Sequence, residues 1–175
     1  GSIVINGNIN NNLKGTLIED AVNAIEVENG GNFIIENATF ENNFRSINIL
    51  AGSYPFPTNY IRGTTFTNSD IYLVKPPMAG ISSDMHIKTE GVTELTIGDP
   101  DEEANHFEKA RIGIWMRNSS ATVYNNTFEK LNTGVVQQFG NTANPTLIGG
   151  LNQDEKNVFE NVAIGIRGSY LKKVT

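Results

Sequence analysis

The stretch that decides the fold is NNTFEKLNTGVVQ, residues 125–137, because near copies of it occur on both sides. The chain reads ANHFEKARIGIWM at 104–116 and KNVFENVAIGIRG at 156–168. Self-similarity of this kind indicates a structural unit that stacks on its neighbours, rather than a catalytic motif used once. The sequence therefore predicts a repeat protein, and the repeat has to be aligned before any element is assigned.

The repeated phrase has an apolar anchor that can be followed through six copies. The anchors are Ile18, Phe40, Phe66, Phe107, Phe128 and Phe159. An aliphatic residue follows each anchor by seven positions: Ile25, Ile47, Leu73, Ile114, Val135 and Ile166. Glutamate directly follows five of the anchors, at Glu19, Glu41, Glu108, Glu129 and Glu160, and Asn105, Asn126 and Asn157 precede the last three by two positions. The shortest interval between anchors is 21 residues, and the longest leaves open whether residues 67–106 hold one coil or two.

A period near 21 residues excludes the common helical repeats, which need more residues and more helix formers. The chain contains 24 Asn and 17 Gly, and both residue types favour turns over helices. A coil of three short strands and three turns fits this period and composition. Stacked coils would place the phenylalanines above one another at about 4.8 Å, the spacing of parallel strands. The asparagines would form a ladder of amide hydrogen bonds along the same axis.

The pattern N-x-F, followed after six residues by an aliphatic residue, together with IGG…NVFEN…GIRG, resembles the repeats of the pectin-lyase-like superfamily. The resemblance extends over about residues 13–168. It implies an all-β fold, a right-handed single-stranded parallel β-helix (solenoid) of about six to seven coils, forming a single domain over residues 1–175. This fold carries lyases, hydrolases, adhesins and phage fibres, so the resemblance leaves the function open. Neither end of the sequence reads as a cap, and we expect a segment of a longer protein, although an edge paired in a dimer would look the same.

Bulk composition limits the classes of partner. The chain has 13 Lys and Arg against 19 Asp and Glu, and the net charge of −6 argues against a nucleic-acid backbone as the partner. No apolar run approaches the roughly 18 residues that suggest membrane insertion. Cysteine is absent, which excludes disulfides and thiol catalysis. We expect a secreted or cell-surface bacterial protein whose partners are a polysaccharide or glycan and other domains of the same parent chain.

Trp115 is the leading candidate for ligand binding. If Ile114 and Met116 point into the coil, strand alternation turns Trp115 and Arg117 outward. An exposed Trp beside an Arg suits a sugar, since the indole offers an apolar face and a polar rim. Neighbouring coils add Gln138 and Arg167 at the same outward offsets. The alternative is a Trp that an inserted loop covers.

The segment AGSYPFPTNYIRG, residues 51–63, carries Tyr54, Phe56 and Tyr60 together with two prolines. A stiff loop with three aromatic residues could overhang the Trp115 side of the solenoid as one wall of a groove. The alternative is a loop that folds its aromatic residues back onto the solenoid.

Carboxylates suggest calcium at two places, although we expect no cofactor. Asp99, Asp101 and Glu102 lie in GDPDEEAN, residues 98–105, which lacks the ligand spacing and central Gly of an EF-hand. The alternative there is an exposed insertion loop. The glutamate column could also offer oxygens to calcium, and its alternative is a solvated face. His86 and His106 stand isolated in the sequence, and we expect His106 to be a turn residue.

The favoured function is a non-catalytic module that acts in carbohydrate binding, adhesion or as a rigid structural spacer. The alternative is a polysaccharide lyase or glycoside hydrolase that acts on acidic polysaccharide. For that alternative, Asp70, Asp84 and Lys88 are the candidate catalytic residues, because β-elimination needs a base and a cation beside the substrate carboxylate. No sequence motif places these three residues together.

Overall fold

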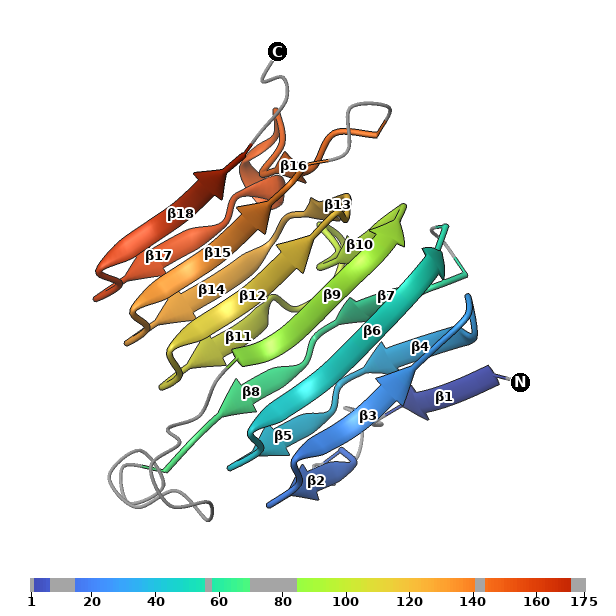
Figure 1. The fold of residues 1–175 in the computed structure, drawn as a ribbon. Coiled ribbons are helices and arrows are strands. Elements are labelled where there is room, and N and C mark those ends of the chain that lie inside the picture. Colours follow the sequence, from blue (N-terminus) through green and yellow to red (C-terminus); the bar gives the residue numbers. More distant parts are fainter. Residues whose placement is uncertain (1, 7–14, 56–57, 70–84, 141–143, 171–175) are drawn as a thin grey trace.

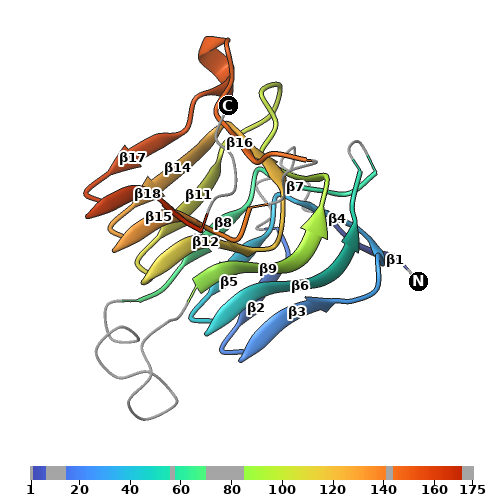
Figure 2. The ribbon, with the colours of Figure 1, turned by 45° about the horizontal axis from the view of Figure 1, so that its top comes forward.

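The computed structural model describes residues 2–6, 15–55, 58–69, 85–140 and 144–170. Over these residues the chain winds into a right-handed parallel β-helix of six coils, each with three strands (Figure 1). Equivalent strands of successive coils pair in parallel and form three six-stranded sheets, called A, B and C below. Figure 2 shows sheet C in front of sheets A and B, with the core between them. The all-β solenoid predicted from the repeat is confirmed.

The strands are short, and each sheet takes one strand from every coil. Sheet A consists of β1 (Ser2–Asn6), β4 (Asn32–Glu36), β7 (Tyr60–Arg62), β10 (Leu95–Ile97), β13 (Ala121–Val123) and β16 (Leu147–Ile148). Sheet B consists of β2 (Leu17–Glu19), β5 (Thr39–Glu41), β8 (Thr65–Thr67), β11 (Asn105–Glu108), β14 (Asn126–Glu129) and β17 (Val158–Glu160). Sheet C consists of β3 (Asn23–Val27), β6 (Arg45–Ser53), β9 (Met85–Thr93), β12 (Ile112–Arg117), β15 (Thr133–Gln138) and β18 (Ile164–Ser169). The 3₁₀ turn η2 (Gln153–Glu155) lies between β16 and β17, and no described helix is long and apolar enough to cross a membrane.

The anchors form one continuous column inside sheet B. Register pairs all six in order, from Ile18 through the five phenylalanines to Phe159. Successive phenylalanine rings lie 4.6–5.1 Å apart at interplanar angles of 0–9°, so they stack face to face with the strand spacing. Phe40, Phe66, Phe107 and Phe128 are fully buried. The predicted aromatic column is confirmed.

In the aliphatic column of sheet C, one residue differs from the predicted alignment. Register aligns Ile25, Ile47, Ile87, Ile114, Val135 and Ile166. The prediction placed Leu73 in the third coil, but Ile87 occupies that position, and Leu73 lies outside the described residues. Because Phe66 pairs directly with Phe107, no additional coil separates them in the described part of the chain. The extra length is an insertion between β8 and β9.

Close packing at the second residue of the sheet C strands explains the glycines that precede the aliphatic column. A Cβ atom on Gly113 would lie 2.9 Å from Cδ1 of Phe128 and 2.8 Å from the carbonyl oxygen of Gly134. Such contacts are too short for a side chain, so glycine lets this backbone pass the phenylalanine column. His86 takes the equivalent position in the third coil and is fully buried.

Candidate functional site

Trp115 lies on the outer face of sheet C, as alternation predicted. Its chain neighbours Ile114 and Met116 are fully buried, whereas the Trp115 side chain is half-buried. In the register of sheet C, Trp115 lies between Lys88 on β9 and Val136 on β15. The Lys88 Nζ atom lies 5.7 Å from the centroid of the indole ring, within the range of a cation–π contact.

Arg117, on the same face of the strand as Trp115, contacts one of two further aromatic rings that the sequence reasoning missed. The Arg117 guanidinium is exposed, lies 3.3 Å from Oε1 of Glu90, and has its Cζ atom 5.6 Å from the centroid of Phe139. Phe139 in turn stacks on Tyr170 at 4.9 Å and 9°. We call Lys88, Trp115, Arg117, Phe139 and Tyr170 the Trp115 face.

The backbone at Phe139 and Tyr170 is unusual for aromatic residues. Both follow the last residue of a sheet C strand and have left-handed φ values of 51° and 54°. The equivalent turn positions of earlier coils carry Gly91 and Asn118, the residue types that tolerate this conformation. The rings are also exposed, at 39% for Phe139 and 76% for Tyr170. Aromatic residues at a turn position that earlier coils fill with the small or polar residues Ala51, Gly91 and Asn118 are the sequence signal that could have identified them.

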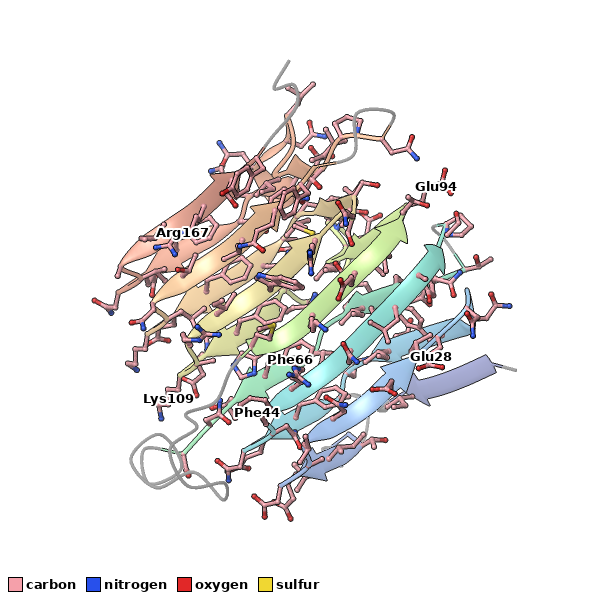
Figure 3. All side chains as sticks on the ribbon, in the orientation of Figure 1. Glu28, Phe44, Phe66, Glu94, Lys109 and Arg167 are labelled. Atoms are coloured by element: carbon pink, nitrogen blue, oxygen red, sulfur yellow. The ribbon has the colours of Figure 1, made fainter. Side chains whose placement is uncertain are left out.

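The other predicted members of this surface are only partly brought together. Gln138 is half-buried and pairs with Arg117 across the strands. Arg167 is exposed on β18, but buried Val136 separates it from Trp115 in the register (Figure 3). Arg167 therefore lies at the border of the Trp115 face.

The predicted aromatic groove wall is wrong for the two tyrosines that can be placed. Tyr54 is fully buried, packs against Phe33 at 5.4 Å and donates its hydroxyl to the carbonyl of Leu50 at 3.2 Å. Tyr60 lies on sheet A, where its hydroxyl donates to Glu36 at 2.7 Å. Phe56 lies outside the described residues. The segment folds its tyrosines onto the solenoid because their rings gain more from packing than from overhanging the surface.

The acidic loop closes on an arginine instead of offering a calcium site. An Oδ atom of Asp99 lies 2.7 Å from the Arg62 guanidinium, and its other oxygen accepts the backbone N–H of Asp101 at 3.0 Å. Glu102 adds a longer contact to Arg62 at 3.7 Å. The predicted calcium set of Asp99, Asp101 and Glu102 is therefore not supported, since its most buried carboxylate is already neutralised by a cation.

The alternative catalytic set cannot be assembled from the described residues. Asp70 and Asp84 lie outside them, and Lys88 lies 3.5 Å from Glu90 and against the indole of Trp115. His86, two residues before Lys88, is buried inside the coil and offers no general base on this face. An ammonium that contacts a carboxylate and an aromatic ring is placed to bind a ligand, and no described carboxylate of the predicted catalytic set lies beside it.

A second polar cluster lies on the outer face of sheet B. His106 and Glu108 on β11 point to the same side, and Glu129 lies on the neighbouring strand β14. The His106 Nε2 atom is 3.9 Å from Oε2 of Glu108 and 3.7 Å from Oε2 of Glu129. His106 is thus a strand residue with two carboxylate neighbours, and the expectation of an isolated turn residue is wrong. Alternation around the anchor Phe107 would have placed His106 and Glu108 together.

Each carboxylate of this cluster is held by a second partner. The Thr67 hydroxyl donates to Oε1 of Glu108 at 2.6 Å, and Lys130 Nζ donates to Oε1 of Glu129 at 2.6 Å. The hydrogen bond from Lys130 lowers the pKa of Glu129, which keeps that carboxylate ionised. In both residues the remaining oxygen, Oε2, is the one that faces His106.

The comparisons with known proteins give one family. Residues 1–152 match the model of a family described as periplasmic copper-binding protein (NosD). No curated protein and no solved structure matches the chain at a significant level.

Proposed function

The chain belongs to the NosD family of periplasmic β-helix proteins, and we propose that it acts there as a non-catalytic module that binds an acidic glycan on the Trp115 face. The observation that carries the proposal is the half-exposed indole of Trp115 on the same outer face of sheet C as Arg117, whose guanidinium lies over the exposed ring of Phe139, itself stacked on Tyr170. Exposed aromatic residues grouped on one face mark a binding surface more often than scattered ones do.

The chemistry of the face favours a carbohydrate. The faces of the aromatic rings match the apolar C–H faces of pyranose rings, and the cations between them can bind hydroxyl or carboxylate groups. Lys88, Arg117 and the bordering Arg167 outnumber the nearby carboxylate of Glu90. A local excess of positive charge on a chain of net charge −6 supports an acidic glycan over a neutral one.

The test is an affinity measurement with polygalacturonate and alginate as acidic probes and laminarin as the neutral one. We expect the acidic probes to bind and Trp115→Ala to weaken that binding by about tenfold or more, the equivalent of one lost stacking contact. Leu147→Ala is the matched control, because Leu147 is an exposed apolar residue on sheet A, and it should bind like the wild type. Equal affinity of Trp115→Ala and the wild type, or no binding of any acidic probe, would contradict the proposal.

Incubation of the chain with polygalacturonate and alginate also tests the lyase alternative. A lyase would release unsaturated sugars from the polyuronates, and Lys88→Ala would stop their release. We expect no unsaturated product, with the glycan recovered intact.

The family description supplies a second candidate function, copper binding, and the donor atoms of the chain decide which copper ion would fit. Cu(I) prefers thiolate and thioether ligands. The chain has no cysteine, Met78 lies outside the described residues, and Met85 and Met116 are buried in the coil. Imidazole and carboxylate donors suit Cu(II), and the sheet B cluster of His106, Glu108 and Glu129 provides them. The observations therefore favour Cu(II) over Cu(I) if the chain shares the property named in the family description.

A further inference from the structure

We propose that His106, Glu108 and Glu129 form a binding site for one divalent transition-metal ion on the outer face of sheet B. The inference rests on the second candidate function above and assigns residues to it. The three residues offer donor atoms that all lie within 4.8 Å of one another. All three side chains are partly exposed, so an ion can reach them from solvent without any opening of the coil.

The His106 nitrogen and the two carboxylate oxygens are too far apart to hydrogen-bond to one another. The Nε2–Oε2 separations of 3.9 Å and 3.7 Å exceed the length of a hydrogen bond. A metal ion with bonds of about 2.0–2.2 Å to imidazole and carboxylate would join the three atoms after a small inward shift. The site thus has the dimensions of a metal centre rather than of a closed hydrogen-bond network.

The partners behind the ligands orient them toward a common point. Thr67 holds one oxygen of Glu108, and Lys130 holds one oxygen of Glu129, so each carboxylate presents its other oxygen to His106. Outer partners of this kind fix the direction of metal-binding carboxylates. The ligands also stand on two paired strands, and the register of β11 and β14 fixes their spacing.

Only this pair of coils in sheet B combines an imidazole with the glutamate column. In the register, the positions equivalent to His106 carry Leu17, Thr39, Thr65, Thr127 and Val158. Glu41 belongs to the same glutamate column, but Thr67 separates it from Glu108 and Thr39 stands where His106 would be. Glu41 therefore provides an internal control with the same column and the same strand alternation.

The donor set selects among ions. One nitrogen and two carboxylate oxygens suit a borderline transition metal, with water filling the open positions, whereas calcium needs six to eight oxygens. For a given nitrogen and oxygen site, Cu(II) binds more tightly than Ni(II) or Zn(II). We therefore expect Cu(II) to give the highest affinity and Zn(II) a lower one at the same residues.

The experiment is titration of the full chain with CuCl₂ and with ZnCl₂ by calorimetry, combined with electron paramagnetic resonance of the Cu(II) form. We expect one Cu(II) per chain, with a spectrum that shows coupling to an imidazole nitrogen. His106→Ala should remove that coupling and weaken binding by tenfold or more, and Glu129→Gln should weaken it in the same direction. Glu41→Gln should bind like the wild type, and circular dichroism should show that all the variants remain folded.

The possible results distinguish an error in the residue assignment from an error in the second candidate function, copper binding. If Cu(II) binds the wild type but His106→Ala leaves both affinity and spectrum unchanged, the residue assignment is wrong while copper binding stands. If neither Cu(II) nor Zn(II) binds the wild type, both the site and the second candidate function are wrong.

Discussion

At the scale of single residues, His86 is the clearest departure from the repeat. It stands at the position where later coils use Gly113 and Gly134, and its ring lies 5.8 Å from that of Phe66 and 6.2 Å from that of Phe107. Nε2 donates to the carbonyl of Glu108 at 2.8 Å, which defines the tautomer, and Nδ1 has no partner among the described residues. Burial lowers the pKa of His86 from 6.5 to about 4.

This histidine makes stability depend on pH in a defined window. Between pH 6.5 and about 4 the unfolded chain binds a proton at His86 that the folded chain does not, so the free energy of unfolding falls as the pH falls. The loss due to this group should reach about 3 kcal/mol and end near pH 4, where both states are protonated. Urea unfolding at pH 7.5 and pH 4.5 of the wild type and of His86→Gln measures it.

The variant should lose less stability across this window, because Gln carries no titratable proton. Carboxylates titrate in both proteins and cancel in the difference. An equal loss in the wild type and the variant would show that His86 is not held neutral in the folded chain.

At the scale of elements, the asparagine ladder connects the beginnings of the last three strands of sheet B. Asn105 donates to Asn126, and Asn126 donates to Asn157, each at 2.9 Å between side chains. Asn126 also donates to the backbone carbonyls of Ile97 and Tyr124 at 3.0 Å and 2.8 Å. The sequence predicted this ladder because the residue type and spacing recur, and hydrogen bonding along the axis is what an amide can do at that spacing.

Removing one rung of the ladder should destabilise the fold. Asn126→Ala removes the acceptor of one N–H of the buried Asn105 amide and one of the two donors to the Ile97 carbonyl. We expect it to lower the free energy of unfolding by about 1–3 kcal/mol. Asn132→Ala, at an exposed turn position of the same coil, should cost less than about 0.5 kcal/mol. Chemical denaturation of the two variants compares them. Similar free energies of unfolding for the two variants would mean that the ladder does not stabilise the fold.

Alignment at this scale succeeded where the copies agree and failed where an insertion intervenes. The anchors and the glutamates follow from a constant phrase length, and the structure places them in register. Leu73 was chosen by counting seven positions from Phe66, but the insertion between β8 and β9 moves the aliphatic position to Ile87. Counting cannot detect such an insertion, because the physical requirement is an aliphatic side chain in the column and not a fixed separation.

At the scale of the whole molecule, the phenylalanine column extends through five of the six coils. Phe128 lies within the column, stacked between Phe107 at 5.0 Å and Phe159 at 4.9 Å. Phe128→Ala should open a cavity that rigid strands cannot fill, and we expect a loss of about 3–5 kcal/mol in the free energy of unfolding. The exposed Phe139→Ala is the control, with a loss below about 1 kcal/mol. A loss of similar size in both variants, measured by guanidinium denaturation, would exclude the column as the main source of stability.

The two candidate sites lie on different sheets and were predicted to different extents. Alternation along one strand placed Trp115 and Arg117 outward, and the structure agrees. Phe139 contacts Arg117 from a left-handed turn one coil further along, and Tyr170 stacks on Phe139 from the next coil. His106 meets Glu129 only through the pairing of β11 with β14. Contacts between coils depend on register as well as residue type, so reasoning about single strands could not find them.

The central claim is that the constant positions of the repeat build the solenoid and that the divergent outward positions of sheet C bind the ligand. A crystal structure of the chain with a bound galacturonate oligosaccharide tests this claim most directly. The account predicts a sugar ring stacked on Trp115, with a carboxylate near Lys88 or Arg117 and the glycan continuing toward Phe139 and Tyr170. An oligosaccharide bound to sheet A or sheet B, with the Trp115 face left free, would contradict it.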